Sequence, residues 1–294
     1  LISFGKGSYI ITMPKSWIQK NNLKKGDLIS VDDGGFELVL RANQADKASE
    51  SKEINIDAKG KDIELMKAEI VSSYLNGYDT INISFDNNDK EAPKIKDIIR
   101  NLSGLEIMEQ TSNRILAKNL ININEISIQN IIRRMDIITR AMIEDTILCC
   151  RGNYNYESIH NRDADVNRLY FLGYRVIKNA MKNPRIAKSL GIESWQLHSD
   201  TLIILRLEKI ADRQKRLARY LCTANLDRAT FAELDKVHTD ISECYNDVMK
   251  SYYNQDKQIA YQIEVTNKDR IAACDKLLEK STDMYANSKG KSTN

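Results

Sequence analysis

The 294-residue chain has few of the residues that interrupt or cross-link a fold, with three prolines, twelve glycines and five cysteines. No apolar run of about eighteen residues and no secretion signal is visible, so we expect no membrane insertion and predict a cytoplasmic protein. The net charge of +3 excludes a uniformly basic surface, so any contact with nucleic acid must come from a local patch. The cysteines are odd in number and contain no Cys-x-x-Cys pair, and we interpret them as reduced thiols that pack as small hydrophobes: Cys149, Cys150, Cys222, Cys244 and Cys274.

Motifs for catalysis are also missing. The sequence contains no glycine-rich phosphate loop, no nucleophile–base set and no zinc motif. A carboxylate-bridged di-iron bundle needs Glu-x-x-His on two helices, and the motif occurs once, from Glu157 to His160. We therefore expect no enzyme. We interpret His160 as a polar edge residue, with a metal ligand as the alternative. The remaining aromatic candidates are interpreted as packing residues: Trp195, Tyr252 and Tyr253.

The most informative segment lies near the N-terminus. A glycine turn leads into a predicted strand at 8–13, and Pro14 then opens a short helix that carries Trp17 and Ile18 on one side. Two further strands are predicted at 28–31 and 36–40, joined at Gly34-Gly35 because glycine adopts positive φ without strain. A unit of about forty residues rarely holds a sufficient core, so we expect it to dimerise.

The run Ser-Tyr-Ile-Ile-Thr-Met-Pro-Lys-Ser-Trp at 8–17, followed by Leu-Lys-Lys-Gly-Asp at 23–27, resembles the SpoVT-AbrB class of swapped-hairpin DNA-binding domains. The resemblance implies a domain over 1–42 in which two chains interleave their hairpins and present basic loops to DNA. A module used only for dimerisation or partner docking is the alternative. The DNA-binding residues that we predict are five lysines that contact phosphates and one serine near the bases: Lys6, Ser8, Lys15, Lys20, Lys24 and Lys25.

A polar linker at 42–52 precedes a region of alternating strand and helix patterns. This alternation predicts a small α/β domain over 53–121, whose role as a spacer or as a small-molecule sensor stays open. The predicted elements are strand 54–57, helix 62–75, strand 80–85, helix 93–102, strand 105–108 and strand 115–120.

From residue 124 to 283 the apolar residues repeat at helical spacing, which predicts a bundle of five amphipathic helices. The fold class is thus multidomain α+β, with a β-rich N-terminal unit, an α/β domain and an all-α bundle. In the fourth helix we expect Phe231, Leu234, Ile241, Tyr245 and Val248 to face inward. The predicted helices cover about 128–149, 156–182, 194–224, a segment beginning near 227, and 256–278, with a polar tail at 281–294.

Carboxylates interrupt the apolar stripes of two bundle helices. Asp163 shares a face with Ile159 and Val166, and Glu208 and Asp212 lie four residues apart. Like charges at this spacing repel, so we expect either a metal ion or nearby arginine and lysine side chains to neutralise them.

These carboxylates resemble the PhoU family, in which Glu/Asp-x-x-x-Asp pairs in three-helix repeats hold metal ions. The resemblance implies iron or zinc bound by Asp163, Asn167, Glu208 and Asp212. Arg213 stands where the family favours histidine. The ion-pair interpretation is the alternative, because Asp212 has cations within one helical turn on both sides: Lys209 and Arg216.

An N-terminal SpoVT-AbrB unit followed by a PhoU bundle is the arrangement of archaeal PhoU-like phosphate uptake regulators. The resemblance implies a homodimeric transcriptional regulator of phosphate uptake, with DNA and phosphate transporter or sensor kinase components as partners. The alternative is an adapter that docks to such a transporter or kinase without binding DNA. No second carboxylate pair is clear around 267–275 and no sixth helix follows, so we expect either that the lineage lost this helix or that the chain is cut short. Because the first residue is Leu1, we also expect a fragment at its start.

Overall fold

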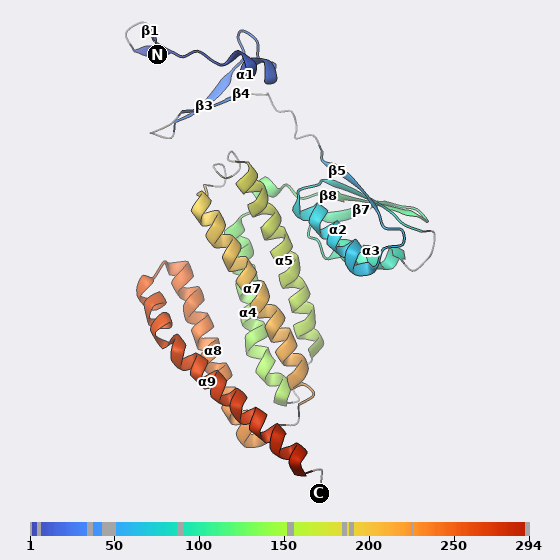
Figure 1. The fold of residues 1–294 in the computed structure, drawn as a ribbon, viewed down its shortest axis with the longest axis vertical. Coiled ribbons are helices and arrows are strands. Elements are labelled where there is room, and N and C mark those ends of the chain that lie inside the picture. Colours follow the sequence, from blue (N-terminus) through green and yellow to red (C-terminus); the bar gives the residue numbers. More distant parts are fainter. Residues whose placement is uncertain are drawn as a thin grey trace. The chain divides into compact units, whose positions relative to one another are not determined.

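The structure is a computed structural model that describes residues 2–4, 7–33, 38–42, 51–86, 91–151, 156–183, 187, 191–224 and 226–291. The chain forms two compact units, Leu1–Lys52 and Glu53–Asn294. Each unit is described by itself below, with the element labels of Figure 1.

The described residues of the first unit form two antiparallel strand pairs and one short helix. Strand β1 pairs with β2, and β3 pairs with β4. The prediction of a strand at 8–13 was too long, since β2 pairs with β1 only as far as Ile10. The predicted turn at Gly34-Gly35 lies outside the described residues. The elements are β1 Ile2–Phe4, β2 Ser8–Ile10, α1 Lys15–Lys20, β3 Ile29–Asp33 and β4 Leu38–Ala42.

The described residues of this unit form no buried core in one chain. None of its described side chains is buried, although it is rich in large apolar residues. Apolar surface on this scale is covered in stable proteins by another element or another chain, because its transfer out of water drives association. The exposed large apolar side chains are Ile2, Tyr9, Ile10, Ile11, Leu28, Val31 and Leu38.

The second unit begins with the predicted α/β domain. Its four strands form one sheet in the order β5-β6-β8-β7, in which β5 and β6 are parallel and the other neighbours antiparallel. Helices α2 and α3 pack on one face of this sheet (Figure 1). Asp62 caps α2 by accepting the Leu65 N–H at 2.8 Å, as its position before an apolar run favours. The elements are β5 Glu53–Asp57, α2 Ile63–Leu75, β6 Thr80–Ser84, α3 Glu91–Arg100, β7 Leu105–Gln110 and β8 Arg114–Asn119.

The bundle has a core of three long helices. Helices α4, α5 and α7 lie side by side and bury the apolar stripes that the sequence predicts (Figure 1). Helix α8 packs on α4 and forms an antiparallel pair with α9. The elements are the 3₁₀ segment η1 Ile123–Glu125, α4 Ile128–Thr146, the 3₁₀ segment η2 Ile147–Arg151, α5 Tyr156–Lys182, α7 Ser194–Leu221, α8 Arg228–Asn254 and α9 Lys257–Lys291.

Two expectations for the last helices were wrong. Residues 281–291, predicted as a polar tail, continue helix α9. Ile241 and Val248, predicted to face inward, are exposed, because α8 buries only the narrow stripe formed by His238, Tyr245 and Met249. A helix that buries one narrow stripe contributes less to the core than its pattern of apolar residues suggests.

Arg175 of α5 joins the bundle to the α/β domain. Its fully buried guanidinium donates to the backbone carbonyls of Tyr74 at 2.5 Å and Tyr78 at 3.1 Å. It also lies over the Tyr74 ring, 4.7 Å from the centroid. The two hydrophobic cores are separate clusters, and Arg175 makes a polar contact between them, beside Phe171 of α5, which packs against the α/β core.

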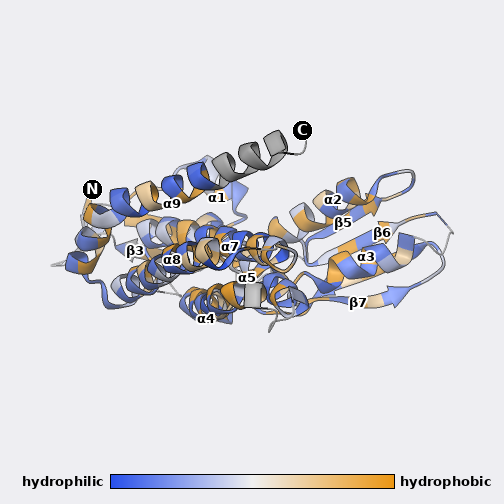
Figure 2. Ribbon diagram, turned by 90° about the horizontal axis from the view of Figure 1, so that it is seen from below, coloured by the Kyte–Doolittle hydropathy of each residue, from blue (hydrophilic) through white to orange (hydrophobic). Residues whose placement is uncertain are grey.

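Hydrophobic and hydrophilic residues are mixed along each bundle helix (Figure 2). Among the described residues, no helix combines the length and the hydropathy that a membrane span needs.

Candidate functional sites

Helix α1 is amphipathic despite its length of six residues. Trp17 and Ile18 are half-buried, whereas Lys15 and Lys20 are exposed, as the sequence predicts. Pro14 precedes the first turn, and its carbonyl accepts the Trp17 N–H at 3.0 Å and the Ile18 N–H at 3.2 Å. The helix thus holds two lysine side chains in solvent, while its two apolar side chains are only half-buried.

A second pair of lysines lies on the turn before β3. The Asp27 carboxylate accepts the Lys24 N–H at 2.6 Å, and the Asp27 N–H donates to the Lys24 carbonyl at 3.1 Å. Gly26 has a φ of +97°, which favours glycine. The side chains of Lys24 and Lys25 are exposed. The local sequence therefore closes the turn with backbone and carboxylate groups and leaves both ammonium groups available.

Four of the six predicted DNA-binding residues are accounted for as exposed lysines in this unit: Lys15, Lys20, Lys24 and Lys25. Lys6 lies outside the described residues, and Ser8 is in β2 with a side chain that is not described. Exposed ammonium groups of this kind suit phosphate contacts, which position a protein on a duplex without reading its sequence. The role of these six residues in DNA binding stays a prediction.

The predicted carboxylates of the bundle do come together between α5 and α7. Asp163, with a nearly buried side chain, accepts a hydrogen bond from Lys215 Nζ at 2.6 Å and another from Asn167 Nδ2 at 3.2 Å. Lys215 Nζ also lies 3.0 Å from Asp212 Oδ1, so a single ammonium bridges the two helices. Arg216 adds a second cation to Asp212, at 2.9 Å. We call these residues, with Glu208, the carboxylate cluster.

Among the described residues, Glu208 is the carboxylate of this cluster without an ion pair. Burial raises the pKa of Glu208, and the neighbouring carboxylates of Asp212 and Asp163 raise it further. Burial lowers the pKa of Lys215, but its hydrogen bonds to Asp163 and Asp212 outweigh this effect, and the net shift is upward. Lys215 therefore stays charged at the place where the carboxylates of the two helices converge.

This geometry favours the ion-pair interpretation. A metal ion at this place would need a free oxygen of the Asp163 carboxylate as a ligand. The Lys215 ammonium already occupies Oδ2 of that carboxylate, at 2.6 Å. In the described part of the chain, no three His, Cys, Asp or Glu side chains are gathered as a metal-binding group. Asp212 pairs with Lys215 and Arg216, and the predicted pairing with Lys209 is not found. Iron or zinc bound by Asp163, Asn167, Glu208 and Asp212 stays a prediction.

Sequence reasoning missed two other buried carboxylates, Asp136 in α4 and Asp200 in α7. Tyr245 and Tyr253 of α8 donate to Asp136 at 2.8 and 3.0 Å. Tyr252 donates to Asp200 at 3.2 Å. The tyrosines interpreted as packing residues therefore also dock α8 on α4 and α7 through hydrogen bonds. Asp136 interrupts the apolar stripe of α4, and this interruption is the sequence signal that could have identified it as a buried carboxylate.

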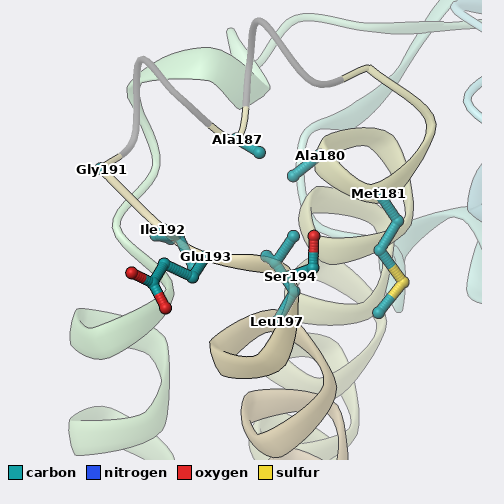
Figure 3. Close-up of a pocket in the computed structure, with 8 residues that line it drawn as sticks. All are labelled: Ala180, Met181, Ala187, Gly191, Ile192, Glu193, Ser194 and Leu197. Carbon is teal, nitrogen blue, oxygen red and sulfur yellow. The ribbon is translucent and has the colours of Figure 1, made fainter. Parts of the chain in front are cut away.

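A cavity of about 790 Å³ lies where α5 ends and α7 begins (Figure 3). Its described walls are mainly apolar, from Ala180 and Met181 on one side to Ile192 and Leu197 on the other. Glu193 is the one charged side chain among the residues drawn, and Figure 3 shows its carboxylate directed away from the other labelled side chains. Ligand sites usually add several convergent polar groups to an apolar wall, so we assign this cavity no function.

Comparison with known proteins identifies the class of the first unit. Residues 2–47 match the family described as "Antidote-toxin recognition MazE, bacterial antitoxin". The N-terminal unit is thus a MazE/AbrB-type domain, as its resemblance to the SpoVT-AbrB class predicts. No curated protein and no solved structure gives a significant match to the chain.

Proposed function

We propose that this protein is a DNA-binding transcriptional regulator that acts as a homodimer through its N-terminal unit. The match over residues 2–47 supports this proposal, because MazE/AbrB-type domains typically bind DNA and dimerise. The observation that carries it is that seven exposed large apolar side chains and four exposed lysines occur together in a unit none of whose described side chains is buried. A second copy would cover the apolar groups and bring two sets of lysines onto one surface.

The finer proposal is that the regulated process is phosphate uptake, with the bundle as a sensor or docking module for phosphate transporter or sensor kinase components. Its support is the resemblance of the carboxylate pattern to the PhoU family, and the convergence of these carboxylates between α5 and α7 agrees with it. The alternative is an adapter whose N-terminal unit only dimerises. The proposal assigns no reaction and no required cofactor to the chain.

Charge reversal on α1 tests DNA binding directly. The variant Lys15→Glu/Lys20→Glu should no longer retard promoter DNA in a gel, because each dimer loses four cations from the proposed surface. The affinity of the wild type for DNA should fall steeply as salt is added. If all four lysines contact phosphates, the slope of the logarithm of the binding constant against the logarithm of the salt concentration should be smaller in magnitude by about 3 to 4 in the variant. Lys236→Glu/Lys250→Glu, two exposed lysines of α8, is the matched control. Unchanged retardation by the α1 variant would remove this function and favour the adapter.

A further inference from the structure

The face of α7 opposite the bundle core carries large apolar side chains in solvent. Trp195 is 73% exposed, Leu202 45% and Tyr220 63%. These residues are separated by seven and eighteen positions, and at 3.6 residues per turn they lie along one side of the helix. Their side is distinct from the buried stripe that includes Leu197, Ile204 and Leu207. An exposed tryptophan and tyrosine on one rigid helix face are typical of an interaction surface.

Between these apolar ends the same face is basic. Arg206, Lys209, Arg213 and Arg216 follow Leu202 at alternating steps of four and three residues, and all four side chains are exposed. Within the described residues, the first three have no ion pair, while Arg216 reaches back to Asp212 of the carboxylate cluster. The acidic residues of this segment of α7 lie off this line and are partly buried. We call the line from Trp195 to Tyr220 the α7 outer face.

We propose that the α7 outer face is a docking surface for an acidic amphipathic helix of a protein partner. Charge complementarity specifies the centre of this partner, where carboxylates would face four cations that no described acid fully neutralises. Apolar side chains toward both ends of the partner helix would cover Trp195, Leu202 and Tyr220. The alternation of four and three residues is the spacing with which two helices pack along their length.

The apolar ends favour a protein over nucleic acid as the occupant. A phosphate backbone would neutralise the arginines but would leave Trp195 and Leu202 without apolar contacts. Tryptophan, tyrosine and arginine are the residue types that dominate binding energy at protein interfaces. The inference goes beyond the proposed function, since the DNA-binding role belongs to residues 2–47 and the α7 outer face lies in the other unit.

A designed peptide tests the inference on the full chain. The probe is a fluorescein-labelled helical peptide of about 28 residues, the length of α7, with leucines near both ends and glutamates at the central positions of one face. Fluorescence anisotropy should detect binding, and a peptide with lysines in place of the central glutamates should not bind. Arg206→Glu/Arg213→Glu should weaken binding about tenfold or more, because it reverses two of the central charges. Trp195→Ala should weaken it severalfold by removing an apolar anchor.

The control variant Lys236→Glu/Lys250→Glu should bind the glutamate peptide as the wild type does, and circular dichroism should show that all variants keep their helical content. Equal binding of the glutamate and lysine peptides, or full binding by Arg206→Glu/Arg213→Glu, would overturn the inference. So would loss of duplex retardation in this variant without any peptide binding, which would make the face a nucleic-acid contact. Failure of the proposed function gives a different result, since Lys15→Glu/Lys20→Glu would then leave retardation unchanged.

Discussion

Replacing Lys215 by methionine perturbs the carboxylate cluster at the group that bridges its two helices. The substitution keeps the aliphatic part of the side chain and removes the ammonium that lies 2.6 Å from Asp163 and 3.0 Å from Asp212. Among the residues that the structure describes, Asp163 then keeps the Asn167 amide as its hydrogen-bond donor. Asp212 retains Arg216, so the unpaired charge falls mainly on Asp163.

The expected loss of stability follows from the burial of the pair. Breaking a buried ion pair costs about 3 to 5 kcal/mol, because it leaves one charge without compensation. The side chain of Asp163 is 6% exposed and that of Lys215 is 22% exposed, so solvent reaches the lysine side of the pair. We therefore expect the lower end of the range, about 3 kcal/mol, at pH 7. Asp163→Asn/Lys215→Met removes both charges and should lie within about 1 kcal/mol of the wild type.

Urea unfolding followed by circular dichroism measures both values, and an unchanged dependence on urea concentration would show that the variants unfold from the same native state. If Lys215→Met lowers the free energy of unfolding by less than about 0.5 kcal/mol, the reasoning is refuted, because a loss of that size is what an exposed ion pair would give. Elemental analysis of the wild type then becomes decisive. Stoichiometric iron or zinc that disappears in Glu208→Ala would establish the metal interpretation of this cluster.

Two further predictions concern buried polar groups of the second unit. Arg175→Met should lower the free energy of unfolding by about 3 kcal/mol, because the buried carbonyls of Tyr74 and Tyr78 lose their charged donor between the two cores. It should also broaden the urea transition, and a sharp transition at the wild-type midpoint would contradict this. Burial raises the pKa of Asp200, so the native state gains stability as the pH falls toward about 4, the ordinary value of aspartate. At pH 7 the Asp200→Asn variant should therefore have a higher melting temperature than the wild type, and this difference should shrink near pH 4. Thermal melts in which the difference stays constant between the two pH values would count against the prediction.

The sequence predicted most regular elements because their signals are local. Helix α5 has the predicted bounds, Tyr156–Lys182, since its apolar spacing begins and ends clearly. Helix α9 was predicted too short, because the serines, asparagines and lysines of 281–291 resemble a polar tail. Ile241 and Val248 were placed inward because periodicity identifies a face but not how closely a neighbouring helix covers it.

The candidate sites were predictable in position but only partly in pairing. Asp163, Glu208 and Asp212 could be placed on helix faces from their spacing, and they do converge. The bridging role of Lys215 depends on how far α7 is displaced along α5, which no local pattern specifies. The bonds from Tyr252 and Tyr253 to buried carboxylates join residues more than fifty positions apart and were missed for the same reason.

Sedimentation equilibrium of the full chain, alone and with a fluorescent promoter duplex, tests most directly whether the N-terminal unit pairs with a copy of itself to bind DNA. We predict a free species of twice the 33.7 kDa of one chain, and two chains on each duplex. Leu28→Lys/Val31→Lys, which places charge on two of the exposed apolar positions, should abolish both assemblies together. A wild-type chain that sediments as a monomer with and without the duplex would contradict the account.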